Sequence, residues 1–160
     1  MKKYKEEKQV GIIYHFRREI QSVIKSLTVG LKGNLTYGET MALLYPTFNL
    51  PKDKKLFVYC FTRNKNWNFK GKANYKCLLV LNGTKMSNKY KFIPIQERYM
   101  QRKDNRSEFE ERIINEKEFI DIKPYLVEIQ VNESVKDIKN LDKLKKICEK
   151  ENIKLTITNK

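Results

Sequence analysis

The sequence predicts an α+β fold. Three observations carry the prediction: several short apolar runs bounded by turn residues, two stretches with helical spacing, and a final unit that reads strand, helix, strand. The apolar runs predict six strands, at 10–16, 56–62, 75–81, 90–95, 125–131 and 153–158. The class is α+β because a helix connects the strands of the final unit, whereas short polar turns are expected between the middle strands.

Two helices are predicted from the spacing of apolar residues. The first carries Ile20, Val23, Ile24 and Leu27 on one face and stops near Gly30. The second is expected to be capped by Ser134, with an apolar face made of Val135, Ile138, Leu141, Leu144 and Ile147 and a lysine-rich opposite face. This helix is long enough to connect two parallel strands, whereas short polar turns such as Asn82-Gly83 are expected between the middle strands.

Two stretches have no assigned element. The segment 31–51 is interrupted by glycine and proline and contains a short apolar patch at 41–44, and the segment 96–106 is nearly all polar. Long loops of this kind often serve as lids or binding loops. Both segments are therefore candidates for such a loop.

Composition restricts the class of protein. Of 160 residues, 34 are Lys or Arg and 19 are Asp or Glu, which gives a formal net charge of +15. The length suits a single domain over 1–160 with a flexible basic stretch at 1–8, and the 40% hydrophobic content excludes a disordered chain. No apolar run approaches the ~20 residues of a membrane helix and residues 1–8 do not resemble a secretion signal, so a cytoplasmic protein is expected. Because Cys60, Cys77 and Cys148 lie far apart, we expect reduced thiols and no metal site.

Two polar positions at strand ends are candidates for binding. The sole histidine, His15, lies near the end of the first predicted strand, where clefts form at sheet edges, although a lone histidine is more often structural. The strand that ends at Thr62 breaks into Arg63 and Asn64, which can bind an anion and polar groups, followed by Trp67, which can stack on a ring. The alternative is a solvated turn with Trp67 folded into the core.

The densest acidic cluster of this basic chain covers 106–114. If the segment is extended, Glu108, Glu110 and Arg112 face one way while Phe109 and Glu111 face the other. The alternative is a helix whose capping box uses Ser107 and Glu110, which would make Glu110 a backbone cap.

The order of three blocks resembles the ADP-ribosyltransferase-like superfamily: a strand ending in Tyr14-His15-Phe16, a strand ending in Phe61-Thr62-Arg63, and the acidic run 108–112. The sequence also resembles small phage and mobile-element proteins over 61–114. The resemblance implies a mixed, split β-sheet core with flanking helices. Where that superfamily has Ser-Thr-Ser, this chain has Phe61-Thr62-Arg63, and its stacking tyrosine has no secure counterpart, with Tyr37 and Tyr45 as candidates.

The resemblance implies an NAD-dependent ADP-ribosyltransferase, an enzyme of the glycosyltransferase class, with NAD as co-substrate and no metal. His15 and Glu110 would be catalytic, and Glu108 and Glu111 are the alternatives to Glu110. The residues implied to bind NAD are Tyr14, Thr62, Arg63, Asn64 and Tyr37. A carboxylate suits this chemistry, since cleavage of the bond between nicotinamide and ribose passes through a cationic centre.

The basic surplus bears on the acceptor or partner. Lysine-rich segments lie close to aromatic residues, as in 52–59, 65–75 and 85–92, a combination that attracts phosphate backbones and stacks bases. The alternative is that part of this charge is solvated surface without a binding role. The expected acceptor is therefore a nucleic acid or a host protein, modified by a phage or mobile-element effector. The alternative function is a non-enzymatic, basic nucleic-acid-binding or host-factor inhibitor protein. A metal-free nuclease with His15 as base ranks below both because no partner for the histidine is evident.

Overall fold

The computed structural model describes residues 10–67, 71–94 and 110–158. The main sheet contains β1 (Ile12–Arg17), β3 (Asn34–Tyr37), β4 (Lys55–Thr62), β5 (Cys77–Asn82), β6 (Phe92–Pro94), β7 (Glu110–Asn115), β9 (Leu126–Asn132) and β10 (Lys154–Thr158), and β2 (Leu31–Lys32) pairs with β8 (Phe119–Ile120). The described ranges also hold four α-helices: α2 (Ile20–Thr28), α3 (Gly38–Leu44), α4 (Gly83–Met86) and α5 (Ile138–Glu151). The fold is therefore α+β, as predicted.

The main sheet is mixed and has the order β10-β9-β5-β1-β4-β7-β6, with β3 paired to β4 beside this path. All registered pairs are antiparallel except that of β9 with β10, which is parallel. Helix α5 connects these two parallel strands, which confirms the predicted strand–helix–strand unit. The six predicted strand ranges correspond to β1, β4, β5, β6, β9 and β10.

Three local predictions need correction. Helix α5 begins at Ile138 rather than after Ser134, because the Asp137 side chain accepts a hydrogen bond from the Asn140 backbone N–H and acts as the N-cap. Asn82-Gly83 is not a turn between paired strands: Asn82 caps α4 by accepting from the Lys85 N–H. The unassigned segment 31–51 holds two strands and α3, which its glycine and proline residues concealed.

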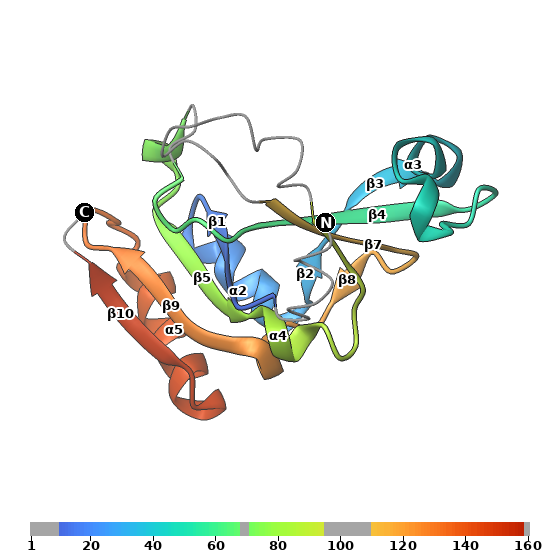
Figure 1. Ribbon diagram of the computed structural model, residues 1–160. Coiled ribbons are helices and arrows are strands. Elements are labelled where there is room, and N and C mark those ends of the chain that lie inside the picture. The colour runs from blue at the N-terminus through green and yellow to red at the C-terminus, as the bar shows by residue number, and fades with distance from the viewer. Residues whose placement is uncertain (1–9, 68–70, 95–109, 159–160) are drawn as a thin grey trace.

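Helices α2 and α5 cover one face of the sheet, which we call the helix-covered face (Figure 1). The main core lies between these helices and the sheet. Its strand residues include Ile13, Leu79, Leu81, Ile129 and Val131, and its helix residues include Ile20, Val23, Leu27, Leu144 and Cys148. Alternation along each strand sends the neighbouring residues to the opposite face, which we call the open face. None of the helices in the described ranges is long and apolar enough to cross a membrane.

A smaller core occupies the far end of β4, where α3 packs beside β3 and β4 (Figure 1). It contains Met41 and Tyr45 with Leu56, Ile93 and Ile114. The Cβ of any other residue at Gly38 would lie 1.8 Å from the Pro51 carbonyl oxygen, so a glycine is required where the chain enters α3. Helix α3 therefore covers the open face at this end of β4, and the uncovered part of that face begins beyond it.

Candidate functional site

The three sequence blocks meet on neighbouring strands. Tyr14 of β1 is the registered partner of Thr62 of β4, and Thr62 is the registered partner of Glu110 of β7. Directly opposed residues of antiparallel strands point to the same face, so these three side chains form one row across the open face. The extended alternative for the acidic segment is confirmed, since 110–115 is strand β7.

Strands β1 and β4 diverge beside this row. Within the described ranges a single registered pair, Tyr14 with Thr62, joins them. A cavity of about 370 Å³ opens there, lined by Tyr14, His15, Phe16, Cys60, Phe61, Thr62, Trp67 and Tyr75. We call it the junction cavity. Its volume falls within the roughly 300–1,000 Å³ of small-molecule sites, and its walls combine aromatic rings with a few polar groups.

His15 reaches the junction cavity from a different direction. Its registered partner is Leu79, a core residue, which places it on the helix-covered face of β1. The His15 ring lies 5.7 Å from that of Phe61, and Nδ1 lies 2.9 Å from the Cys60 carbonyl oxygen. Because a carbonyl oxygen only accepts, Nδ1 is the donor of this hydrogen bond.

Burial lowers the pKa of His15 to about 4, against a smaller opposing effect of the Cys60 hydrogen bond. The imidazole is therefore neutral at neutral pH, with its proton on Nδ1 and Nε2 as the unprotonated ring nitrogen. The hydrogen bond also anchors the ring to β4 where the two strands separate. His15 thus has a structural role whether or not it has a catalytic one.

The turn after β4 positions Trp67. The Asn64 N–H donates to the Thr62 hydroxyl at 3.0 Å, the Asn66 N–H donates to Asn64 Oδ1 at 3.0 Å, and the Trp67 N–H donates to the Asn64 carbonyl at 3.0 Å. Such side-chain contacts fix a local turn. Trp67 is half-buried and lines the junction cavity rather than either core, which favours the stacking alternative over the core plug.

Glu110 is buried and held by a charged partner. Its carboxylate accepts from Arg112 Nε, and Arg112 Nη1 donates to the Tyr45 hydroxyl at 2.7 Å. Burial alone would lower the pKa of Arg112, but the hydrogen bond to Glu110 and the nearby carboxylate charge raise it above its ordinary value. The guanidinium therefore stays charged. Tyr45, one of the two candidate tyrosines, is linked in this way to the row of Tyr14, Thr62 and Glu110.

Glu111 lies on the other face of β7. It is the registered partner of Phe61, its side chain has no exposed surface, and Oε1 lies 3.5 Å from Arg63 Nη1. The pair places Arg63 and Glu111 on the face that carries His15. Two adjacent carboxylates of one strand thus belong to different environments, which the sequence alone left open.

One predicted site residue, Tyr37, does not belong to this assembly. Tyr37 is 58% exposed and pairs with Lys55, at the end of β4 opposite Thr62. Lys55 and Thr62 are seven steps apart along the strand, about 24 Å, so Tyr37 lies far from the junction cavity. Glu108 falls outside the described residues.

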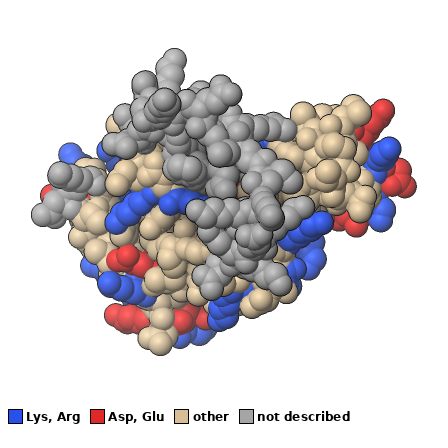
Figure 2. All heavy atoms as spheres, viewed as in Figure 1, with Lys and Arg blue, Asp and Glu red and all other residues tan. Residues whose placement is uncertain are grey.

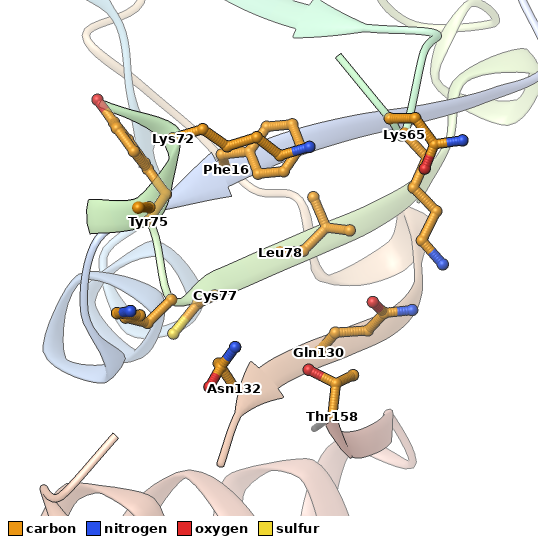
Figure 3. Close-up of a pocket in the computed structure, with 12 residues that line it drawn as sticks. Phe16, Lys65, Lys72, Tyr75, Cys77, Leu78, Gln130, Asn132 and Thr158 are labelled. Atoms are coloured by element: carbon orange, nitrogen blue, oxygen red, sulfur yellow. The ribbon is translucent and has the colours of Figure 1, made fainter. Parts of the chain in front are cut away.

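A second cavity adjoins the first on the open face and was not predicted. It has a volume of about 710 Å³ and shares Phe16 and Tyr75 with the junction cavity. Lys65, Lys72 and Lys76 also line it, with Gln130, Asn132 and Thr158 among its further lining residues (Figure 3). We call it the lysine cavity. The polar residues that alternate with apolar ones in 126–132 were the signal for it, since they predict a strand with one face outside the core.

Within the described ranges, no group of three or more His, Cys, Asp or Glu side chains is arranged to hold a metal ion. Cys77 and Cys148 are buried, and burial raises the pKa of each thiol to about 11, as expected for unreactive thiols. Comparison of the chain with protein-family models, with curated proteins and with solved structures finds no match.

Proposed function

We propose that this protein transfers ADP-ribose from NAD at the junction cavity. One observation carries the proposal: three blocks distant in the sequence lie on adjacent strands, with Tyr14, Thr62 and Glu110 in one registered row. The divergence of β1 and β4 is compatible with the split sheet that the sequence resemblance implies. It leaves a cavity between two strands whose ends carry polar and aromatic side chains.

The lining of the junction cavity suits a nicotinamide ring and its ribose. Tyr14 and Trp67 offer aromatic residues for stacking, and Thr62 and His15 are residues with polar groups in the same lining. Arg63 would contact the diphosphate. Its pairing with Glu111 is compatible with that role, because a guanidinium has five N–H donors.

The reaction breaks the bond between the nicotinamide nitrogen and ribose C1′. The bonding electron pair goes to the nitrogen, whose positive charge is cancelled, and C1′ becomes cationic. An acceptor then forms a bond to C1′ and loses a proton. In this proposal Glu110 stabilises the cationic centre, since a preorganised carboxylate contributes most where positive charge develops. His15, neutral and anchored by the Cys60 carbonyl, would orient the ribose hydroxyls.

Glu110 is the preferred carboxylate because it shares a face with Thr62 and Tyr14. It does not itself line the junction cavity among the described residues, but its registered neighbour Thr62 does. Arg112 fixes its position through the bond to Tyr45. Glu111, fully buried beside Phe61, has the surroundings of a structural ion pair.

The test is release of nicotinamide and transfer of label from radiolabelled NAD, with and without nucleic acid and bacterial lysate as acceptors. We expect Glu110→Gln to lower the rate on the order of 100-fold, as for removal of other transition-state-stabilising groups. Glu149→Gln, an exposed change of the same chemistry on α5, should leave the rate unchanged.

Two outcomes would overturn the proposal. Absence of nicotinamide release with every acceptor would remove the activity itself. Loss of activity in a folded Glu111→Gln protein, with Glu110→Gln fully active, would assign the chemistry to the helix-covered face instead.

A further inference from the structure

We infer that the open face of the sheet binds single-stranded nucleic acid through the lysine cavity. The inference goes beyond the proposed function, because binding needs no chemistry at the junction cavity. It starts from a registered row on the open face: Phe16 of β1 pairs with Leu78 of β5, Leu78 with Gln130 of β9, and Gln130 with Thr156 of β10. The row crosses four strands and carries an aromatic ring at one end and polar groups at the other.

The cavity over this row combines rings with cations. Within the lining, Lys72 Nζ lies 5.4 Å from the centroid of the Phe16 ring; the Arg18 guanidinium, which is not part of the lining, lies 5.2 Å from the centroid of the Tyr75 ring. Figure 3 shows Phe16 and Lys72 on one side of Leu78, with Gln130 and Thr158 on the other. A ring beside a cation suits a nucleotide, because the ring provides a surface on which the base can stack and the cation attracts the phosphate.

The wall formed by β9 and β10 is polar rather than apolar. Gln130, Asn132 and Thr158 line it, and amide and hydroxyl groups both donate and accept hydrogen bonds. They suit the edges and sugars of nucleotides better than an apolar protein surface. A duplex keeps its bases stacked inside, so rings set within a cavity favour unpaired bases.

A carboxylate of β9, Glu128, lies beside the cavity residue Gln130. Glu128 accepts from Thr156 and from Gln130 Nε2, and it lies 3.8 Å from Lys154 Nζ. The Thr156 hydrogen bond is the main cause that lowers the pKa of Glu128, and Lys65 contributes a smaller effect, so the carboxylate is charged near neutral pH. Its charge is offset by Lys154 and Lys65. The three lysines of the cavity and the net charge of +15 leave the region attractive to a polyanion.

Lysine and arginine are also spread over the rest of the visible surface (Figure 2). A basic surface alone would attract any polyanion, so the inference is specific to one location. The matched comparison is with Lys139, Lys143 and Lys146, which are exposed on α5, the helix that covers the opposite face. Neutralising either set removes the same charge from the protein.

The experiment measures fluorescence anisotropy of labelled 20-mer oligonucleotides, single-stranded DNA and RNA and a DNA duplex, over a series of salt concentrations. We expect the single strands to bind more tightly than the duplex. The variant Lys65→Gln/Lys72→Gln/Lys76→Gln should bind on the order of 100-fold more weakly at ~0.1 M salt. The slope of log K against log salt should become shallower by about 2, because each phosphate contact on a single strand contributes about 0.7. Replacing Tyr75 by leucine should weaken binding on the order of tenfold through lost stacking.

Three results would overturn the inference. The first is an unchanged salt slope in the Lys65/Lys72/Lys76 variant, and the second is an equal loss in the Lys139/Lys143/Lys146 variant. The third is a duplex, or poly-glutamate, that binds as tightly as the single strands. Thermal unfolding of each variant confirms that it is folded, and nicotinamide release from NAD alone reports separately on the proposed function.

Discussion

The two faces of the sheet are built from the same strands but differ in chemistry. On the helix-covered face, the registered partners His15, Leu79, Ile129 and Leu155 lie among or beside the residues of the main core. On the open face, the next row is Phe16, Leu78, Gln130 and Thr156. Each strand therefore alternates between residues that face the helices and residues that face away from them, although Leu78 on the open face is itself buried.

The comparison separates the residues that stabilise the fold from those that the proposed binding would use. Burial of apolar side chains beneath α2 and α5 supplies most of the favourable free energy of folding. The polar and aromatic side chains of the open face are not needed for that burial. They lie beside two adjoining cavities, where the proposed binding would take place, and substitutions on the two faces should therefore have separable effects.

The largest expected effect is on the free energy of unfolding, and it distinguishes two neighbouring residues of β9. Ile129 is fully buried on the helix-covered face, whereas Gln130 is half-buried on the open face. Ile129→Ala should lower the free energy of unfolding by about 2–5 kcal/mol, through lost burial and the cavity it leaves. Gln130→Ala should lower it by less than about 1 kcal/mol, although it removes a hydrogen bond to Glu128. Urea denaturation of the two variants measures both values. Similar losses in the two variants would show that the open face is covered in the folded protein.

The second prediction concerns the pH dependence of stability and His15, on the helix-covered face of β1. The pKa of His15 is lowered by burial to about 4, below its ordinary value of 6.5. A group whose pKa is depressed in the folded state takes up its proton more readily when unfolded, so acid favours unfolding. The contribution of the neutral His15 to the free energy of unfolding is fully present above pH 6.5 and is lost as the pH falls from 6.5 towards 4. Allowing for the partial exposure of the ring, the loss is on the order of 2 kcal/mol.

The variant His15→Asn tests this prediction, because an amide keeps a donor near the Cys60 carbonyl but does not titrate. Urea midpoints of both proteins at pH 7.5 and pH 4.5 give the comparison. We expect the wild type to lose more stability on acidification than the variant. Equal losses would mean that the ring is solvated enough to be protonated in the folded state.

Much of the fold could be predicted from the sequence, because alternation and helical spacing are local signals. Six strands and two helices were found in this way, as was the parallel pairing of the last two strands. Strand β7 remained ambiguous, because Ser107 and Glu110 also fit a capping box. Strands β2 and β3 are too short to show a period, and the glycine and proline residues around α3 hide its helical spacing.

The candidate site was less accessible to sequence reasoning. The blocks that contain Tyr14, Thr62 and Glu110 could be named, but their register depends on strand order, which no local pattern encodes. The same holds for the faces of Glu110 and Glu111, since a shift of one residue exchanges them. The lysine cavity needs four strands to be adjacent, so it emerges only in the folded chain.

The smallest expected effect concerns the start of α5, the helix that distinguishes the covered face from the open one. Asp137 caps this helix through the Asn140 N–H, whereas Ser134 donates its backbone N–H to Asn132 Oδ1, a contact that alanine keeps. Asp137→Ala should therefore cost about 1 kcal/mol of unfolding free energy, and Ser134→Ala close to none. Thermal and urea unfolding of both variants measures the difference. Neither change should alter oligonucleotide binding, since both sites belong to the helix layer and neither lines the lysine cavity. If Ser134→Ala were the more destabilising change, the helix would begin earlier, as its apolar spacing predicts.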